Sequence, residues 1–353
     1  VSTGLPVDQF GIYKTMMHPE LPGQLDYWSA AGGARSVRST ADQLLADGTW
    51  IGTPAQVCQE TGRTVNCRIG DSPEFDDRQD IQALRDRGYT QIFCLPLYSR
   101  YTPALNVVGF ATKTEGGFSQ TEITCLRRIQ APIARIAEGY VLHESTIGVL
   151  STYVGRNAGA RVLTGNILRG DSELIPSIVL FLDLKNYTRL SNDLPPNEVI
   201  QLLNRFFTAV DASVQRNGGE ILKFLGDGVL AIFPTPDDFA AQTAATHAAV
   251  TALQELQNDL NSGGNKLRTA FRAALNLGDL HYGNIGSVSR LDFTVVGPTV
   301  NLTSRLLDIS ANLGEDIVCS VDVASLLGVR ARSLGKHEVK GFQEAIEVFA
   351  VDH

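Results

Sequence analysis

Two short apolar runs on either side of the tripeptide Gly226-Asp227-Gly228 constrain the fold of this chain more than any other feature. The runs, 220–225 and 229–233, have the length and composition of β-strands, and a turn of this kind folds two strands into a hairpin. Strand and helix candidates alternate around it, in the order 177–184 (strand), 196–216 (helix), the hairpin, 238–261 (helix) and 267–277 (strand). This β-α-β-β-α-β order predicts a ferredoxin-like sheet with helices on one face.

The alternation continues to the end of the chain. Further strand candidates lie at 293–296, near Ile317, at 332–339 and at 346–351, and a helix candidate lies at 299–312. We therefore assign residues 173–353 to one domain of the α+β or α/β class.

Residues 1–140 read as a second mixed α/β domain. Strand candidates lie at 10–17, 91–98 and 105–112, the last two separated by a turn at Pro103, and helix candidates lie within 48–61 and at 80–87. Ser119 with Glu122 has the pattern of a capping box, which predicts a long helix over about 119–147. Its apolar residues are spaced by three or four positions, which suits either a parallel dimer seam or a contact with the domain's own sheet. They are Ile123, Leu126, Ile129, Ile133, Ile136 and Tyr140.

Residues 148–172 are rich in Gly, Arg, Asn and Ser, and we expect them to form a linker that transmits a signal. The 353 residues are 43% hydrophobic and 19% charged, as in folded proteins. The net charge of −8 has the wrong sign for gripping a long nucleic acid. The apolar runs are too short to cross a bilayer, and no segment at the start reads as a signal peptide. We therefore expect a cytoplasmic protein without a membrane partner.

Five cysteines, at positions 58, 67, 94, 125 and 319, form no Cys-x-x-Cys pair. Neither a disulfide framework nor a zinc site is indicated, because both need paired cysteines at characteristic spacings. We expect buried, reduced thiols.

Two carboxylates stand where the predicted strands meet. Asp183 ends the strand candidate at 177–184, and Asp227 lies at the tip of the hairpin expected beside it. Each has an ordinary alternative, because Asp183 could cap the next helix and Asp227 could serve only the turn. Two close carboxylates repel each other unless one takes a proton or a cation lies between them. A pair of Mg²⁺ or Mn²⁺ ions bound to substrate phosphates meets that need.

Other segments carry residues suited to phosphate. After Asp183 the chain is expected to turn into a helix, whose backbone N–H groups can face a phosphate. In the helix candidate at 299–312, Asn301 and Arg305 share a face, where they could meet a reacting phosphate or simply be solvated. The glycines within 278–286 give permissive backbone. The substrate-binding candidates after Asp183 are Lys185, Asn186, Tyr187 and Thr188.

Three blocks resemble the motif blocks of the class III nucleotidyl cyclase catalytic domain, in that family's order and spacing over roughly residues 175–351. They are Val179-Leu-Phe-Leu-Asp-Leu-Lys-Asn-Tyr-Thr188, Gly219-Glu-Ile-Leu-Lys-Phe-Leu-Gly-Asp-Gly-Val-Leu-Ala-Ile-Phe233 and Phe293-Thr-Val-Val-Gly-Pro-Thr-Val-Asn-Leu-Thr-Ser-Arg-Leu306. The resemblance implies that Asp183 and Asp227, with the carbonyl of Leu184, hold two divalent cations. It also implies that Asn301 and Arg305 serve the transition state from the partner subunit.

The family's purine-reading pair falls on Lys223 and Thr294. This pair resembles the class IIIb subgroup, which makes cyclic AMP and is frequently bicarbonate-responsive, whereas guanylyl cyclases of the family use Glu and Cys. A Lys donor suits the unprotonated N1 of adenine, and a Thr hydroxyl can accept from the exocyclic amine. We therefore expect ATP as the substrate and bicarbonate as a candidate regulator.

The resemblance implies an adenylyl cyclase, in which the ribose 3′-oxygen of ATP attacks the α-phosphorus in line and pyrophosphate leaves. Lys340 resembles the family lysine that reaches the terminal phosphates, although Lys336 is nearby and a surface lysine is the alternative. Because one subunit would supply the metal site and its partner the remaining groups, a homodimer would hold two shared active sites. A guanylyl cyclase and a catalytically silent nucleotide-binding regulator are the alternatives.

Residues 1–140 resemble a GAF domain, a sensory module for small ligands. The likeness rests on Leu5-Pro-Val-Asp8, Gln91-Ile-Phe-Cys-Leu-Pro-Leu97, Val107-Val-Gly-Phe-Ala111 and Gly117-Phe-Ser-Gln-Thr-Glu122. It implies a small-molecule ligand that regulates the second domain through the long helix. His18-Pro19-Glu20 and Trp28 could line a pocket or form a packed loop, and no Cys–His pair supports a chromophore.

Overall fold

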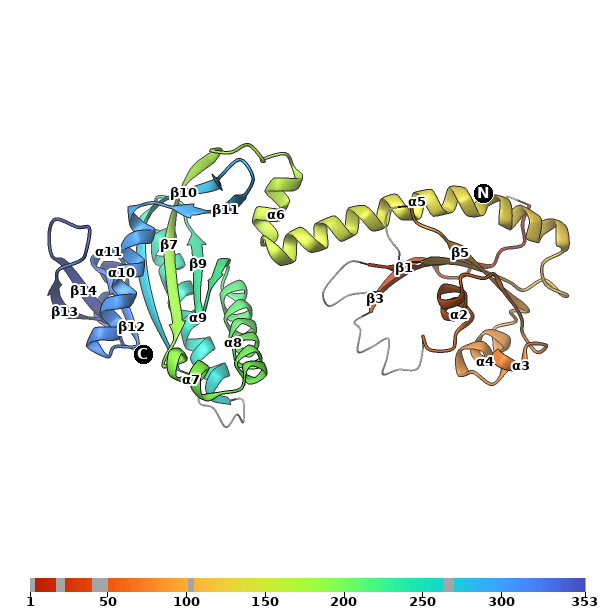
Figure 1. Cartoon of the computed structure of the whole chain (residues 1–353), viewed down its shortest axis with the longest axis horizontal. Coiled ribbons are helices and arrows are strands. Elements are labelled where there is room, and N and C mark those ends of the chain that lie inside the picture. Colours follow the sequence, from red (N-terminus) through yellow and green to blue (C-terminus); the bar gives the residue numbers. More distant parts are fainter. Residues whose placement is uncertain (1–3, 17–22, 40–49, 101–104, 263–269, 353) are drawn as a thin grey trace. The chain divides into compact units, whose positions relative to one another are not determined.

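The computed structural model describes residues 4–16, 23–39, 50–100, 105–262 and 270–352. The chain divides into two compact units, Val1–Ala160 and Arg161–His353. Each unit is built on its own sheet (Figure 1), and each has a hydrophobic core of its own.

The N-terminal unit contains an antiparallel sheet in the order β3-β2-β1-β6-β5-β4. The three strands predicted from the sequence are confirmed as β1, β5 and β6, while residues 17 and 103 lie outside the described residues. The strand bounds are β1 (Gln9–Thr15), β2 (Gly23–Ser29), β3 (Gly33–Ser39), β4 (Val65–Arg68), β5 (Gln91–Leu97) and β6 (Asn106–Thr112).

Different helices cover the two faces of this sheet (Figure 1). The long helix α5 (Gln120–Tyr153) packs on one face, where Leu126 is buried against Phe93 and Phe110. On the other face lie α2 (Pro54–Thr61), α3 (Pro73–Asp76) and α4 (Gln79–Asp86). The predicted helices within 48–61 and at 80–87 are confirmed as α2 and α4.

Helix α5 begins at the predicted capping box. The Ser119 hydroxyl accepts a hydrogen bond from the Glu122 backbone N–H, and the Glu122 carboxylate accepts one from the Ser119 N–H. The apolar stripe packs on the domain's own sheet through three of its six residues. Ile123, Leu126 and Ile133 pack on the domain's own sheet. Ile129, Ile136 and Tyr140 are exposed.

The predicted linker at 148–172 is helical over its first half. Helix α5 runs to Tyr153, and α6 (Arg156–Leu163) follows it. One glycine of this segment has a packing role, because a Cβ on Gly159 would lie 3.1 Å from the backbone carbon of Leu150. None of the described helices has both the length and the apolar character that a bilayer crossing requires.

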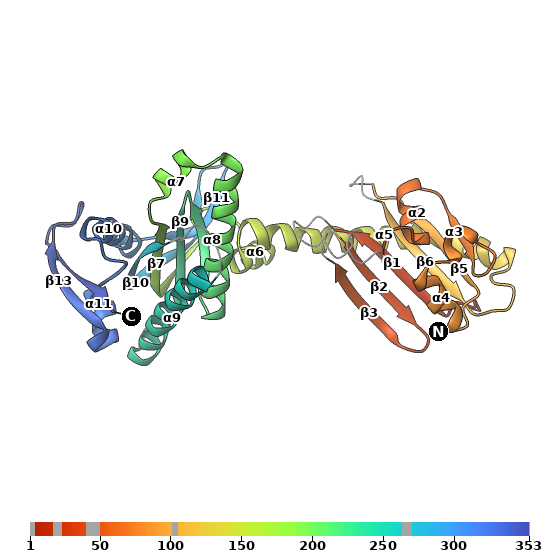
Figure 2. The ribbon, with the colours of Figure 1, turned by 90° about the horizontal axis from the view of Figure 1, so that it is seen from below.

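The second unit contains a mixed sheet in the order β13-β14-β12-β10-β7-β9-β8, with β11 paired to β10. The predicted β-α-β-β-α-β order is present as β7–α8–β8–β9–α9–β10 (Figures 1 and 2). The strand bounds are β7 (Ser172–Leu184), β8 (Glu220–Leu225), β9 (Gly228–Pro234), β10 (Phe271–Gly286), β11 (Leu291–Val296), β12 (Ile317–Ser320), β13 (Ala331–His337) and β14 (Ile346–Val351). The helices are α7 (Tyr187–Asp193), α8 (Pro196–Arg216), α9 (Phe239–Ser262), α10 (Pro298–Leu313) and α11 (Val321–Leu327).

The prediction that the helices of the β-α-β-β-α-β unit cover one face of the sheet is confirmed for α8 and α9, while α10, which follows the unit, lies on the other face. Helices α8, α9 and α11 pack on one face, where Leu182, Phe206 and Leu253 share a core. Helix α10 packs on the other face, where Leu306 contacts Ala274. Residues 273–276 of β10 are therefore buried on both faces of the sheet, so consecutive positions there are inaccessible to solvent.

Strand β10 is also longer than predicted, because the glycines within 278–286 belong to it. A Cβ on Gly278 would lie 2.5 Å from the Thr299 hydroxyl, and one on Gly283 would lie 2.0 Å from the Asp171 carbonyl oxygen. These glycines allow neighbouring segments to approach the strand closely instead of ending it.

Candidate active site

The ends of three strands bring two aspartates together at one edge of the second sheet. Asp183, near the end of β7, pairs in register with Gly228 of β9 on one side and with Arg272 of β10 on the other. Asp227 precedes Gly228 in the turn between β8 and β9. The pairing thus places the two carboxylates that the sequence singled out on adjacent strand ends.

The electrostatics of Asp227 reflect this placement. Burial raises the pKa of the Asp227 carboxyl, and the negative charge of Asp183 raises it further, while Arg272 acts in the opposite direction. Two carboxylates in a partly buried site repel each other, so the ionised pair is stabilised by a nearby positive charge. A bound cation would therefore stabilise the ionised pair.

Arg272 supplies one such charge, and the sequence analysis missed it. Its Nε donates a hydrogen bond to Oδ1 of Asp183 at 3.0 Å, and its Nη2 donates to Oδ2 at 2.9 Å. Such a fork fixes the plane of the carboxylate as well as neutralising it. The residues are 89 positions apart, so the pairing register of β7 and β10 is the only signal that could have revealed the contact.

The donor set fits divalent cations that prefer oxygen ligands. Asp183 and Asp227 are hard carboxylate ligands, and Mg²⁺ is commonly held by one or two carboxylates together with substrate phosphates. The described residues contain no group of three or more His, Cys, Asp or Glu side chains placed to hold a metal.

Some side chains in the segment after Asp183 already have contacts within the fold. Lys185 forms an ion pair with Asp316, and its backbone N–H donates to the Ala270 carbonyl at 2.8 Å. Tyr187 packs against the core. Asn186 has a left-handed backbone with φ of 60° before α7 begins, and Asn186 and Thr188 are exposed.

Lys223 and Thr294 lie on strands that the fold brings together. Lys223 of β8 forms an ion pair with Asp292 of β11, two residues before Thr294 and therefore on the same face of that strand. Thr294 is buried. The Tyr282 hydroxyl of β10 donates to the Glu220 carboxylate of β8 at 2.9 Å, which fastens this end of the sheet. Asp292 is a second contact that the sequence analysis missed.

The remaining predicted residues are exposed and lie on other elements. Asn301 and Arg305 share a face of α10, as their spacing predicts, and Arg305 forms an ion pair with Asp308 at 3.2 Å. Lys340 lies in the turn after β13. No ion pair or hydrogen bond found within the described residues joins these three side chains to either aspartate.

The cysteines are all free, and four of the five are buried. Burial raises the pKa of the Cys58 thiol to about 12 and that of Cys67 to about 11. Such thiols stay protonated and unreactive near neutral pH. Of the predicted pocket residues in the N-terminal unit, Trp28 is 42% exposed on β2, and His18, Pro19 and Glu20 lie outside the described residues.

Comparison with known proteins assigns the second unit to a family. The model of the adenylate and guanylate cyclase catalytic domain matches residues 175–353, so the chain belongs to this family. An adenylate cyclase of Anabaena cylindrica is 26% identical over 272 residues, which cover 64% of this chain and 53% of that protein. Adenylate cyclase 1 of Rhizobium meliloti is 30% identical over 181 residues, covering 49% and 27%. The chain thus spans about half or less of these relatives.

A solved bacterial light-regulated adenylyl cyclase is similar in fold. It matches 82% of this chain and 93% of its own with a TM-score of 0.52 and 21% sequence identity. The similarity supports a cyclase fold, with its mixed sheet and flanking helices, for the second unit.

Proposed function

We propose that this chain is an adenylyl cyclase that converts ATP to 3′,5′-cyclic AMP and pyrophosphate. The observation that supports this most is the meeting of Asp183 and Asp227 at one sheet edge, where two neighbouring carboxylates can hold divalent cations. The family includes both adenylate and guanylate cyclases. The choice of ATP rests on Lys223 and Thr294, since an ammonium donor suits N1 of adenine and opposes the protonated N1 of guanine.

Each residue then has a role in the proposed reaction. Asp183, Asp227 and the Leu184 carbonyl would hold two divalent cations, Mg²⁺ or Mn²⁺, which when bound supply acidification of the ribose 3′-hydroxyl and neutralise the triphosphate. Arg272 holds the Asp183 carboxylate in one plane.

The remaining groups bind and stabilise the substrate. Asn301 orients the ribose, and Arg305 stabilises the charge that spreads over the phosphoryl oxygens as the bond to pyrophosphate breaks. Phosphate contacts are proposed for Lys340, Lys185, Asn186, Tyr187 and Thr188.

We further propose that two copies of the chain share their active sites. Lys223, Thr294, Asn301 and Arg305 of one subunit would complete the site at the aspartates of the other. Large apolar side chains are exposed at the tip of β8 and at both ends of β11, where a second copy would cover them. They are Phe224 (51% exposed), Leu225 (49%), Leu291 (41%) and Val296 (42%).

The N-terminal unit is proposed to be a GAF-like sensory domain that regulates the cyclase. The exposed residues Ile129, Ile136 and Tyr140 of α5 suit a helix seam between two subunits. Such a seam would change the relative placement of the catalytic domains when the sensor changes. Bicarbonate is the other candidate regulator. A chain that starts at Gly170 and retains full regulation would contradict the role of the N-terminal unit.

The test is an assay of the purified chain with ATP or GTP and with Mg²⁺ or Mn²⁺. We expect cyclic AMP from ATP, and expect both Asp227→Asn and Arg305→Ala to lower kcat by about 100-fold or more, as for lost transition-state contacts. The matched controls are Asp259→Asn and Arg216→Ala, which alter a surface ion pair between α8 and α9. Nucleotide binding without product would favour the silent regulator, and faster turnover of GTP would favour a guanylyl cyclase.

A charge reversal tests the base assignment. Lys223→Glu should lower kcat/KM for ATP by about 10-fold to 100-fold relative to GTP, because a carboxylate accepts from the guanine N1–H and repels the unprotonated N1 of adenine. An unchanged ratio of the two kcat/KM values would remove Lys223 from the proposed site.

A further inference from the structure

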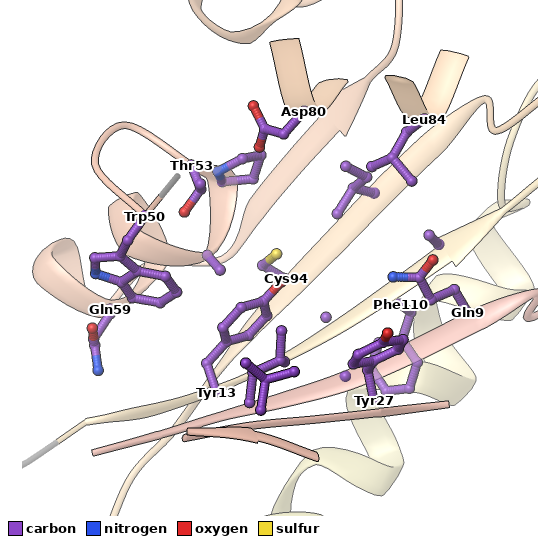
Figure 3. A pocket seen from close by; sticks show the side chains of 18 of the residues that line it. Gln9, Tyr13, Tyr27, Trp50, Thr53, Gln59, Asp80, Leu84, Cys94 and Phe110 are labelled. Atoms are coloured by element: carbon purple, nitrogen blue, oxygen red, sulfur yellow. The ribbon is translucent and has the colours of Figure 1, made fainter. Parts of the chain in front are cut away.

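The N-terminal unit contains a cavity of about 710 Å³ between its sheet and helices α2 and α4 (Figure 3). This is within the range of about 300 to 1,000 Å³ typical of small-molecule sites. We propose that the cavity binds an uncharged, planar aromatic molecule. Binding to the cavity can be measured directly and does not depend on the proposed sensory role of this unit. Only an effect of the ligand on cyclase activity rests on that role.

Part of the cavity floor is backbone without side chains. Gly11 of β1 and Gly109 of β6 lie directly opposite each other in the register, and both line the cavity. A Cβ on Gly109 would lie 3.7 Å from the Cys94 sulfur and 3.7 Å from the Tyr13 ring, which is ordinary contact. Two facing glycines leave a strip without side chains on which a flat molecule can lie.

Aromatic and aliphatic side chains form the walls. The rings of Tyr13 and Trp50 lie with their centroids 5.1 Å apart at an angle of 42°, and Figure 3 shows them side by side at one end of the cavity. Ile81 and Leu84 of α4 line the cavity as well. Tilted aromatic pairs with exposed faces and edges favour a further aromatic ring over an aliphatic chain.

Two of the three charged residues of the lining, Lys14 and Asp80, have ionic partners, and the third, Arg87, is exposed. Lys14 forms an ion pair with Asp26, and its Nζ lies 3.7 Å from the centroid of Tyr140. The Asp80 carboxylate accepts from Arg78 Nε at 2.9 Å. Arg87 is exposed, with its guanidinium 5.4 Å from the Tyr89 ring. Among the described lining residues, the one buried cation, Lys14, is thus already paired, so an anionic ligand held inside the cavity would lose its water without gaining a buried cation, which is costly.

Uncharged polar groups remain for orientation. Gln9 and Tyr13 point into the cavity in Figure 3, and burial raises the pKa of Tyr13, so its hydroxyl stays a neutral donor and acceptor. Burial also raises the pKa of the Cys94 thiol, which disfavours covalent attachment of the ligand. These groups suit a ligand with one or two neutral polar atoms held without a covalent bond.

A matched pair of fluorescent probes tests the ligand class in the full chain. N-phenyl-1-naphthylamine is uncharged, and 1-anilinonaphthalene-8-sulfonate has the same rings with an added sulfonate. We expect the uncharged probe to bind saturably with a blue-shifted emission. We expect the affinity for the sulfonate to be lower by a factor of about 10 or more. Cyclic AMP, an anionic nucleotide, should not displace the uncharged probe. Equal or tighter binding of the sulfonate, or displacement by cyclic AMP, would overturn the assignment of an uncharged ligand.

Filling the cavity tests the location. Gly109→Leu should weaken binding of the uncharged probe by about 10-fold or more, because the added side chain occupies the floor. Gly139→Leu is the matched control, since a Cβ there on α5 meets nothing within 4 Å. Gly109→Ala and Tyr13→Phe, with smaller changes, cover the case in which Gly109→Leu does not fold. Probe affinity unchanged in all three cavity variants would place the probe elsewhere and refute the proposal.

A catalytic variant separates this proposal from the cyclase assignment. Asp227→Asn in the full chain should bind the uncharged probe with the affinity of the parent, because Asp227 lies in the other unit. Probe binding that persists without cyclase activity would leave the cavity assignment intact, whereas cyclase activity without probe binding would refute the cavity assignment alone.

Discussion

The two units use the helix-covered faces of their sheets in opposite ways. In the cyclase unit, Ile178, Leu180 and Leu182 of β7 are fully buried under α8 and α9, and the proposed active site lies at the edge of the sheet. In the N-terminal unit, Gly11 and Gly109 leave the corresponding interior open as a cavity. The comparison indicates that a sheet can serve binding through its face or catalysis through its strand ends, depending on whether side chains fill the interior.

The largest expected effect is a separation of cyclase activity from probe binding. Asp183→Asn should lower cyclase kcat by about 1,000-fold, because it removes a ligand of the cations and the partner of Arg272. Gly109→Leu should retain basal kcat within about twofold while losing probe affinity. Steady-state assays and fluorescence titrations on both variants measure this. Loss of both cyclase activity and probe binding in either variant would show that the two are not separable.

Matched leucine truncations should show how differently the two interiors are packed. Leu182→Ala, in the filled core, should lower the free energy of unfolding of its unit by about 2 to 5 kcal/mol. Leu84→Ala, on the cavity wall, should cost less than about 1 kcal/mol, because its side chain already borders open space.

Denaturant titrations can follow the units separately, because both tryptophans, Trp28 and Trp50, lie in the N-terminal unit. Circular dichroism reports on the whole chain. Equal costs for the two truncations would contradict the difference in packing.

A smaller effect is expected from the carboxylate of the N-terminal sheet. Burial tends to raise the pKa of Asp26, but hydrogen bonds from Lys14, Ser36 and Gln24 outweigh it and hold the pKa below 3.8. Asp26 therefore stabilises the unit above pH 3.8, and the contribution is lost as the pH falls through the lowered pKa. Since Asp26 is partly exposed, the contribution is at most about 1 kcal/mol. Asp26→Asn should flatten the pH dependence of tryptophan-detected unfolding below pH 5, and an unaltered slope would contradict this.

The smallest expected effect concerns Asp227, whose ionisation lowers the stability of the fold, whereas that of Asp26 raises it. Because the pKa of Asp227 is raised, ionisation of Asp227 destabilises the folded unit as the pH rises through that pKa. Without added metal, Asp227→Asn should therefore be slightly more stable than the parent at pH 7, by less than about 1 kcal/mol after screening by solvent. The advantage should disappear below pH 3.8 and should be reversed by millimolar Mg²⁺. Thermal unfolding with and without Mg²⁺ checks this, and a less stable variant without metal would contradict it.

Much of the secondary structure follows from local patterns. The capping box at Ser119, the hairpin at Gly226-Asp227-Gly228 and the helix at Pro196–Arg216 were predictable, because each depends on residues a few positions apart. The features that were not predicted depend on distant neighbours. Glycines within 278–286 belong to a strand, where Thr299 and the Asp171 backbone lie close to them, and α10 lies on the second face of the sheet, where Leu306 packs against Ala274.

The candidate site shows the same division. The two aspartates could be selected because an apolar strand and a tight turn each end in a carboxylate, and the meeting of adjacent strand ends follows from the predicted order. The residues that pair with Asp183 and Lys223 could not be selected from the sequence. Arg272 and Asp292 are ordinary charged residues in the sequence, and only the pairing of β7 with β10 and the approach of β11 to β8 bring them to Asp183 and Lys223.

The sequence by itself determined the order of the elements, the turn that holds Asp227, and the motif blocks that identify a cyclase domain. The tertiary structure decided which charges meet and where space remains. Arg272 reaches Asp183 across 89 positions, and Gly11 faces Gly109 across two strands. The physical reason is that periodicity and capping act over a few residues, whereas strand register and close packing are settled only when distant segments compete for the same interior.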